Sequence, residues 1–221
     1  MDPKSFDELM KQRHSVRYFQ QKEIPLNTLK EIMSTALHSP SWCDSQSWSI
    51  YIASGKTLQE IKNEWLPKNE QGIKGYADIP PEHRTNTEEK TQKNMNTLFK
   101  DVGEFCKDPS LKLFMDSQKI LFNAPTIVYL TAPKKRITYS IIDIGIIEMA
   151  ILLAAKSHGV DSLIAYESIK YPDIIRKYCK VPDNEDIIIG IAFGYEEKCV
   201  ANDYRATKLK VEDVCTFIDE V

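Results

Sequence analysis

The most apolar stretch of the chain reads IIDIGIIEMAILLAA over residues 141–155. Apolar side chains occur almost all the way round a helix drawn through it, which predicts a helix that is buried on every side. The stretch is too short to cross a bilayer, and Asp143 and Glu148 interrupt it, so a transmembrane span is excluded. Gly159 follows as a residue that favours the end of a helix. We therefore place the central helix of a folded core here.

The composition around this helix is that of an average globular protein. The chain has 221 residues, of which 42% are hydrophobic and 28% charged, which excludes disordered chains and small disulfide scaffolds. The net charge of −3 argues against general nucleic-acid binding. Its polar start has no secretory signal, and the five scattered cysteines include no C-x-x-C pair. We expect reduced cysteines, no metal site and a cytoplasmic location.

Short apolar runs predict a sheet whose strands alternate with helices. Strands are expected over residues 49–53, 127–130, 162–165 and 187–193. Helices are expected up to about Gln12, from Pro25 to before Pro40, up to about Leu66, and over residues 111–122, 141–155 and 172–179. An apolar tail over residues 211–218 needs a surface to cover.

Residues 67–110 differ from the rest of the chain. They are rich in Lys, Glu, Asn and Pro and contain few large apolar residues. Such a segment cannot form a core of its own. We therefore expect a single domain over residues 1–221, with a mobile helical insertion at about 67–110 that serves as a lid.

Three polar segments are candidates for a binding site. Residues 13–17, RHSVR, combine cations and a hydroxyl suited to a phosphate, although a solvated basic helix end has the same composition. The loop over residues 40–48 could grip the polar edge of a heteroaromatic ring, or be an ordinary surface turn. Residues 202–208 add Arg205 and Lys208 after a buried strand, or are scattered surface charge. Walker, G-x-S-x-G, H-E-x-x-H and G-x-G-x-x-G motifs do not occur.

In this order, the segments resemble the nitroreductase family of FMN-dependent oxidoreductases. The family opens with an R-x-S-x-R motif, which residues 13–17 match, and continues with a Pro- and Ser-containing loop that ends in a Q-P-W-like element, here residues 39–48. Further matches are Asn123-Ala-Pro125, Asp143-Ile-Gly145, Tyr171-Pro-Asp-Ile-Ile-Arg176, Val181-Pro182, Gly190-Ile-Ala-Phe-Gly194-Tyr195, Tyr204-Arg205 and Lys208. The resemblance covers nearly the whole chain apart from residues 67–110.

The resemblance implies an α+β fold, a three-layer α/β/α arrangement with a central, mostly antiparallel sheet, in an intertwined homodimer. It also implies an enzyme that passes two electrons from NADH or NADPH through bound FMN to nitroaromatics, quinones or related small electrophiles, by a ping-pong mechanism. No catalytic side chain is required, because the flavin supplies the chemistry. No nucleic acid or membrane partner is expected.

The resemblance also assigns the residues around FMN. The phosphate would be held by Arg13, Ser15, Arg205 and Lys208 with His14 nearby, and Arg17 would face the N1/O2 edge of the ring. The loop of the partner subunit would approach the ring. The implied cofactor-binding residues are Arg13, His14, Ser15, Arg17, Pro40, Ser41, Trp42, Asp44, Gln46, Ile164, Tyr166, Glu167, Arg205 and Lys208.

Some residues depart from the family pattern. Asp44 stands where many relatives carry asparagine, Ser47 replaces a proline, and Lys208 keeps the charge of a common arginine without its planar fork. Ile164-Ala165 replaces a frequent proline–glutamine pair, so backbone contacts from residues 164–167 are expected there. Two alternatives stay open: another flavin reductase chemistry, such as dehalogenation or activated-alkene reduction, and a non-catalytic flavin-binding protein.

Overall fold

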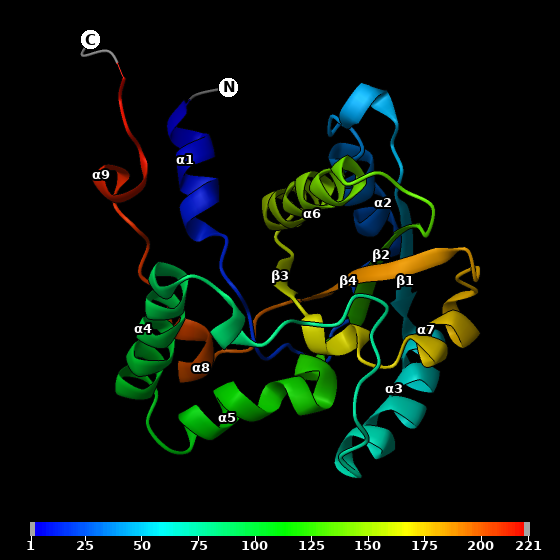
Figure 1. The fold of residues 1–221 in the computed structure, drawn as a ribbon. Coiled ribbons are helices and arrows are strands. Elements are labelled where there is room, and N and C mark those ends of the chain that lie inside the picture. Colours follow the sequence, from blue (N-terminus) through cyan, green and yellow to red (C-terminus); the bar gives the residue numbers. More distant parts are fainter. Residues whose placement is uncertain (1–2, 219–221) are drawn as a thin grey trace.

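The computed structural model describes residues 3–218, which fold around one antiparallel sheet (Figure 1). The strand order is β1-β2-β4-β3, and each neighbouring pair is antiparallel. The strands are β1 Ser49–Ser54, β2 Thr126–Pro133, β3 Asp161–Ile164 and β4 Glu185–Gly194. β2 and β4 occupy the centre and are almost entirely buried, which explains why their sequences are continuously apolar rather than alternating.

Helices cover both faces of this sheet, which confirms the expected three-layer α/β/α architecture (Figure 1). Val128 and Leu130 of β2 pack with α2 and α6 on one face, whereas Ile127 and Tyr129 pack with α3 and α7 on the other. This division follows from the two-residue period of a strand. The α-helices are α1 Pro3–Gln12, α2 Leu26–Ala36, α3 Gly55–Glu70, α4 Glu89–Phe105, α5 Ser110–Asp116, α6 Tyr139–Ser157, α7 Pro172–Cys179, α8 Val200–Asp203 and α9 Val211–Val214. The 3₁₀ turns are η1 Trp42–Asp44, η2 Arg84–Asn86, η3 Ser117–Asn123 and η4 Tyr166–Ile169.

The expectation that the helix over residues 141–155 is buried on every side is wrong for a single chain. Ile144, Ile147 and Ile151 of α6 are buried against the sheet. On the opposite side Ile142 is 53% exposed and Ile146 is 38% exposed. The sheet can cover only one face of a helix, so the second apolar face of α6 is left open within the chain.

The helix predicted over residues 111–122 is shorter in the structure. α5 ends at Asp116, and Leu121, Phe122 and Asn123 adopt left-handed backbone angles. These angles bring the chain against Phe19, whose backbone N–H donates to the Phe122 carbonyl at 3.2 Å. The Asn123 Nδ2 donates to the Phe19 carbonyl at 3.0 Å. Contacts with a distant segment therefore override the local preference for helix.

The insertion over residues 67–110 is tied to the body of the fold at its start. Asp78 accepts two hydrogen bonds from the Arg176 guanidinium, at 3.1 and 2.7 Å, and one from the Ile187 backbone N–H at 2.8 Å. Its later part, α4, packs through Val102 and Cys106. Residues 80–91 between them are exposed. The mobility predicted for the insertion therefore concerns residues 80–91 above all, and it stays a prediction.

Ser168 and Gly190 pack so closely that a Cβ on residue 190 would lie 2.0 Å from the Ser168 Oγ. We expect Gly190→Ala to lower the free energy of unfolding by about 1–3 kcal/mol through overpacking. In a Ser168→Ala background the same change should cost less, because the oxygen that it meets is absent. Urea unfolding of the four proteins measures this coupling. Equal costs in the two backgrounds would contradict the packing seen here.

Candidate functional site

Residues 13–17 leave α1 and run as extended chain beside β3. The Val16 N–H donates to the Ser162 carbonyl at 3.1 Å, and Ser15 forms a parallel bridge with Ser162. Val16 points into the core, whereas Ser15 is exposed. Arg13 and Arg17 are partly exposed. The motif therefore exposes Ser15, whereas the ring of His14 is buried.

Asn202 joins this motif to the C-terminal segment. Its side-chain Oδ1 accepts hydrogen bonds from the backbone N–H groups of Arg17 at 2.7 Å and Tyr18 at 3.2 Å. Its Nδ2 donates to the carbonyls of Tyr18 and Glu197, both at 2.8 Å. The side chain is fully buried. Sequence reasoning quoted this residue within a polar run but assigned it no role, since its partners lie at the other end of the chain.

His14 supports the same junction. The buried ring lies with Nδ1 3.0 Å from the Gln12 carbonyl and Nε2 3.2 Å from the Glu196 carboxylate. Both ring nitrogens are thus engaged within the chain. His14 is placed to hold Arg13 and Ser15 in position, whereas its direct contact with a cofactor stays a prediction.

The cations of the two segments are available to an anion. Arg205 donates through Nη1 to the carbonyls of Asn202, at 2.5 Å, and Tyr204, at 3.0 Å, so its fork is turned toward the junction. Among residues 3–218, no carboxylate forms an ion pair with Arg13, Arg205 or Lys208. Together with the Ser15 hydroxyl, Arg13 and Arg205 offer charge-assisted donors of the kind that the phosphate of FMN needs.

Two other predicted residues lie toward α4 and α5. The Arg17 guanidinium stacks over the Phe114 ring, 4.0 Å from its centroid. Burial lowers the pKa of Arg17, and the nearby Tyr204 opposes this shift. Lys208 lines a hollow of about 520 Å³ beside α4, together with Tyr204. The structure brings both residues near Tyr204 but does not place them with Arg13.

The predicted loop over residues 40–48 carries its candidate cofactor residues in residues 40–46, and this part is fastened to the N-terminal end of α6. Asp143 is buried, and its carboxylate accepts from the Trp42 backbone N–H at 3.0 Å and from the Ser45 hydroxyl at 3.4 Å. The Trp42 ring stacks on Tyr139 with centroids 5.9 Å apart. In the sequence, Asp143 was visible as an interruption of an apolar run and as part of the Asp143-Ile-Gly145 match, with no role assigned to it. The structure gives it the task of shaping this loop.

Within the loop, the predicted residues bind one another. The Gln46 Nε2 donates to the Asp44 Oδ1 at 2.9 Å, and the Gln46 backbone N–H donates to the Ser41 Oγ at 2.9 Å. Cys43, Asp44 and Gln46 have left-handed backbone angles. The aspartate found where an asparagine is common therefore orients the Gln46 amide, and Pro40 and Trp42 remain exposed beside it.

Residues 164–167 follow β3 and stay close to the sheet through their backbone. The Ala165 N–H donates to the Gly190 carbonyl at 2.7 Å. Tyr166 is 69% exposed, and Glu167 pairs with Lys170 at 2.9 Å. A cavity of about 550 Å³ lies beside them and is mainly apolar. Its lining is Lys74, Gly75, Ala77, Ile79, Pro80, Pro81, Tyr166, Glu167, Ile169, Lys170 and Ile188.

One chain does not bring all the predicted residues together. Residues 15 and 16 lie beside β3, which follows the C-terminal end of α6, and Asn202 is bonded to residues 17 and 18. The loop over residues 40–46 sits at the other end of α6 (Figure 1). The rise of 1.5 Å per residue along α6 separates these ends by roughly 20 Å. The predicted site is therefore present as two halves.

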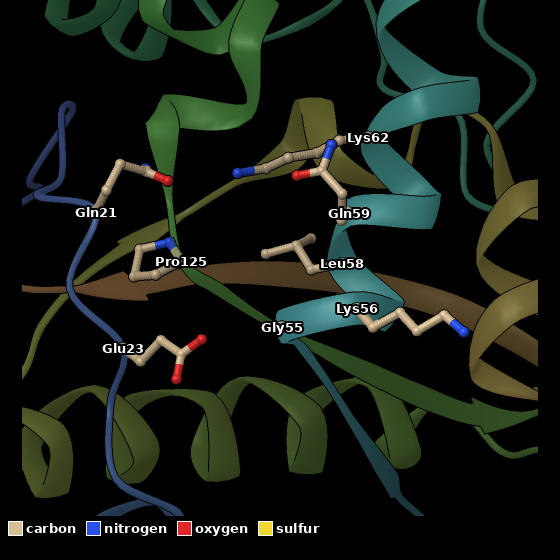
Figure 2. A pocket seen from close by; sticks show the side chains of 8 residues that line it. All are labelled: Gln21, Glu23, Gly55, Lys56, Leu58, Gln59, Lys62 and Pro125. Atoms are coloured by element: carbon tan, nitrogen blue, oxygen red, sulfur yellow. The ribbon is translucent and has the colours of Figure 1, made fainter.

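A further hollow, of about 390 Å³, lies at the start of α3 and is lined by polar side chains (Figure 2). Figure 2 shows Gln21 and Glu23 on one side and Gln59 and Lys62 of α3 on the other. The Lys62 Nζ donates to the Ala124 carbonyl at 2.7 Å, and burial lowers its pKa. This hollow lies apart from the predicted cofactor residues, and Lys62 has a structural task there.

None of the helices within residues 3–218 is long and apolar enough to cross a membrane. In the same range, His, Cys, Asp and Glu side chains do not gather into a cluster that could hold a metal ion.

Comparison with known proteins identifies the family to which this chain belongs. The model of the Nitroreductase family matches residues 10–195. The chain is 23% identical to the chloronitrobenzene nitroreductase of Comamonas testosteroni, with 97% of each chain covered. It is 24% identical to the 4-nitrobenzoate reductase of Pseudomonas putida, covering 96% of this chain and 95% of that protein.

The fold is also found among solved structures. The FMN-dependent nitroreductase NfnB from Mycobacterium smegmatis, solved in complex with NADPH, superposes with a TM-score of 0.86 at 22% identity. The match covers 98% of this chain and 99% of that chain.

The Asn202 junction makes a testable prediction. Asn202→Ala removes the partners of buried backbone groups of residues 17 and 18, so we expect the free energy of unfolding to fall by about 2–3 kcal/mol. The neighbouring residue Asp203 is exposed and offers a matched control. Asp203→Ala should change the free energy of unfolding by less than about 0.5 kcal/mol. Urea unfolding compares the two. If Asn202→Ala loses no more stability than the control, the junction does not hold the motif.

Proposed function

The chain belongs to the nitroreductase family, and from this premise we propose that it is an FMN-dependent oxidoreductase that uses NADH or NADPH to reduce nitroaromatic or related electrophilic acceptors. When bound, FMN supplies the two-electron chemistry. The task of the chain is then to bind the cofactor, orient it and leave one face open to the nicotinamide and the acceptor in turn. The curated relatives named above, which are nitroaromatic reductases, support this assignment.

The observation that carries the proposal is the junction between the two ends of the chain. Asn202 fixes the backbone of Arg17 and Tyr18 against the segment that contains Arg205. Two segments, residues 13–17 and 202–205, thereby present cations and a hydroxyl at one edge of the sheet, and within residues 3–218 Arg13 and Arg205 form no ion pair with a carboxylate. We assign Arg13, Ser15 and Arg205 to the phosphate, and the backbone of residues 164–167 to the ring.

The proposal includes a homodimer, because a single chain separates the two halves of the site. The loop over residues 40–46 lies at one end of α6 and the cationic half at the other. The exposed apolar face of α6, with Ile142 at 53% exposure, offers a second copy a surface to bury. In a two-fold dimer each copy can supply the loop to the cationic half of its partner.

The proposal is tested on purified protein reconstituted with FMN. Anaerobic addition of NADPH or NADH should bleach the yellow colour, and a nitroaromatic such as 4-nitrobenzoate should restore it. Protein that binds FMN and stays yellow with both reductants would be a flavin-binding protein rather than an enzyme. Bleaching that only halogenated or alkene acceptors reverse would assign another reductase chemistry.

Arg205 should contribute strongly to FMN affinity. Loss of a charge-assisted partner costs about 1.5–3 kcal/mol, so we expect Arg205→Ala to weaken FMN binding about tenfold to a hundredfold. Arg205→Lys should be intermediate, because it keeps the charge without the fork. Lys56→Ala, which removes a cation whose side chain is 90% exposed at the start of α3, serves as the control. Fluorescence titration with FMN gives the affinities, and unchanged binding by Arg205→Ala would refute the assignment.

The outer face of α6 should control both assembly and cofactor binding. A glutamate at Ile142 would have to be buried without a partner in the dimer, so we expect Ile142→Glu to weaken dimerisation at least about tenfold. FMN affinity should fall with it, although no phosphate-binding residue is changed. Leu26→Glu, at another exposed apolar residue, is the control. Sedimentation velocity reports the assembly state, and a flavin-loaded Ile142→Glu monomer of parental affinity would exclude a shared site.

A further inference from the structure

The cavity of about 550 Å³ beside residues 164–167 has mainly apolar walls and charged side chains at its rim. Ile169 and Ile188 line it from the body of the fold, and Ile79 lines it from the insertion. Walls of this kind bury the apolar body of a small ligand. The assignment of FMN uses residues 164–167 at the edge of the cavity and leaves the rest of its lining without a role.

The chain is held to the body of the fold on both sides of Lys74. The Tyr171 hydroxyl donates to the Ile73 carbonyl at 2.7 Å, and the Tyr76 N–H donates to the Lys170 carbonyl at 3.1 Å. Lys74 itself is exposed and lines the cavity. Its backbone is therefore fixed at the rim, while its flexible four-carbon stem lets the ammonium group adjust to a ligand.

The other charged side chains of the lining are paired with each other. The Lys170 Nζ lies 2.9 Å from the Glu167 Oε1 and donates to the Asn69 Oδ1 at 2.8 Å. Gly75 packs over this lysine, since a Cβ on residue 75 would lie 2.6 Å from the Lys170 Cγ. Within residues 3–218, no carboxylate forms an ion pair with Lys74. Its charge is therefore available to an anion that enters the cavity.

We propose that this cavity binds the acceptor and that Lys74 selects acceptors that combine an aromatic body with an anionic group such as a carboxylate. This inference rests on the proposed function, because the cavity adjoins the flavin ring only if FMN is bound as proposed. The apolar walls bury the aromatic body, and the Lys74 ammonium group pairs with the anion. A neutral acceptor of the same shape uses the walls alone.

The overall charge of the chain does not favour such a ligand. The net charge is −3, which repels an anion at long range. A preference for anionic acceptors must therefore come from a cation at the cavity itself. A lysine elsewhere on the surface is the control that separates contact from long-range attraction.

Isothermal titration calorimetry on the oxidised protein measures binding without turnover, because no reductant is present. The ligands are 4-nitrobenzoate, which is ionised at neutral pH, and 4-nitrobenzamide, which has nearly the same shape without the charge. We expect Lys74→Ala to raise the Kd of 4-nitrobenzoate about threefold to tenfold and to leave that of 4-nitrobenzamide within about twofold. Lys74→Arg should keep the preference for the anion, and Lys74→Glu should reverse it.

Lys56→Ala, which removes a cation whose side chain is 90% exposed at the start of α3, should change neither Kd. Equal changes for the two ligands in Lys74→Ala, or no change, would overturn the proposal. The same loss of 4-nitrobenzoate binding in Lys56→Ala would also overturn it, since long-range attraction would then explain the preference.

Steady-state kinetics supply a second readout. In Lys74→Ala the KM for 4-nitrobenzoate should rise while kcat stays within about twofold, because the ion pair is present in the ground state and the transition state alike. The KM for 4-nitrobenzamide should stay at the parental value. A fall in kcat for both acceptors with unchanged KM values would contradict a role in acceptor selection.

The two proposals fail in different ways. A protein that binds 4-nitrobenzoate through Lys74 but is not bleached by NADPH or NADH keeps a site for anionic aromatic compounds and fails the proposed function. A protein that is bleached and reoxidised by both acceptors, with the same affinities in the parent and in Lys74→Ala, fails only the role of Lys74.

Discussion

Helix α6 sets the distance between the two parts of the predicted cofactor site. Asp143 near its start holds the loop over residues 40–46, and the strand that follows its end pairs with the RHSVR motif. A helix is stiff, so these anchors cannot approach each other within one chain. The same helix buries Ile144, Ile147 and Ile151 against the sheet and leaves Ile142 open. The architecture of the fold, the separation of the two halves and the proposal of a second copy thus share one cause.

Local signals were sufficient for most of the fold. The run over residues 187–193 became β4, and the helix expected over residues 172–179 has those limits in α7. In both cases an apolar pattern is bounded by proline, glycine or polar residues, and the element in the structure lies within about two residues of the predicted limits. The predictions failed where contacts with a segment distant in the sequence changed the local conformation. The helix over residues 111–122 ends early because Phe19 requires the backbone of Phe122 and Asn123 in another conformation.

The candidate site was predictable to the extent that its residues form motifs. Arg13 and Ser15 were recognisable in the sequence, and the structure places Ser15 beside β3. The residues that organise the site were not, because Asn202 and Asp143 act on backbone groups far away in the sequence. A buried amide or carboxylate leaves no pattern of its own. Glu148 was likewise visible only as a break in an apolar run, and only the fold shows that its Oε1 is buried without a hydrogen-bond partner among residues 3–218.

The Asn202 junction also bears on how the chain folds during synthesis. The hydrogen bond from the Arg17 N–H to the Asn202 side chain closes a loop of 185 residues. The chain entropy that is lost on closing such a loop opposes formation of this bond. Strands β1 to β4 all precede residue 202 and can pair first, since the chain emerges from the ribosome N-terminal end first. Until the last segment is made, the backbone of residues 17 and 18 lacks its partner. The proposed cationic half of the site can therefore be completed only after residue 202 is made, and a nascent chain with a finished sheet does not yet hold residues 17 and 18 in place.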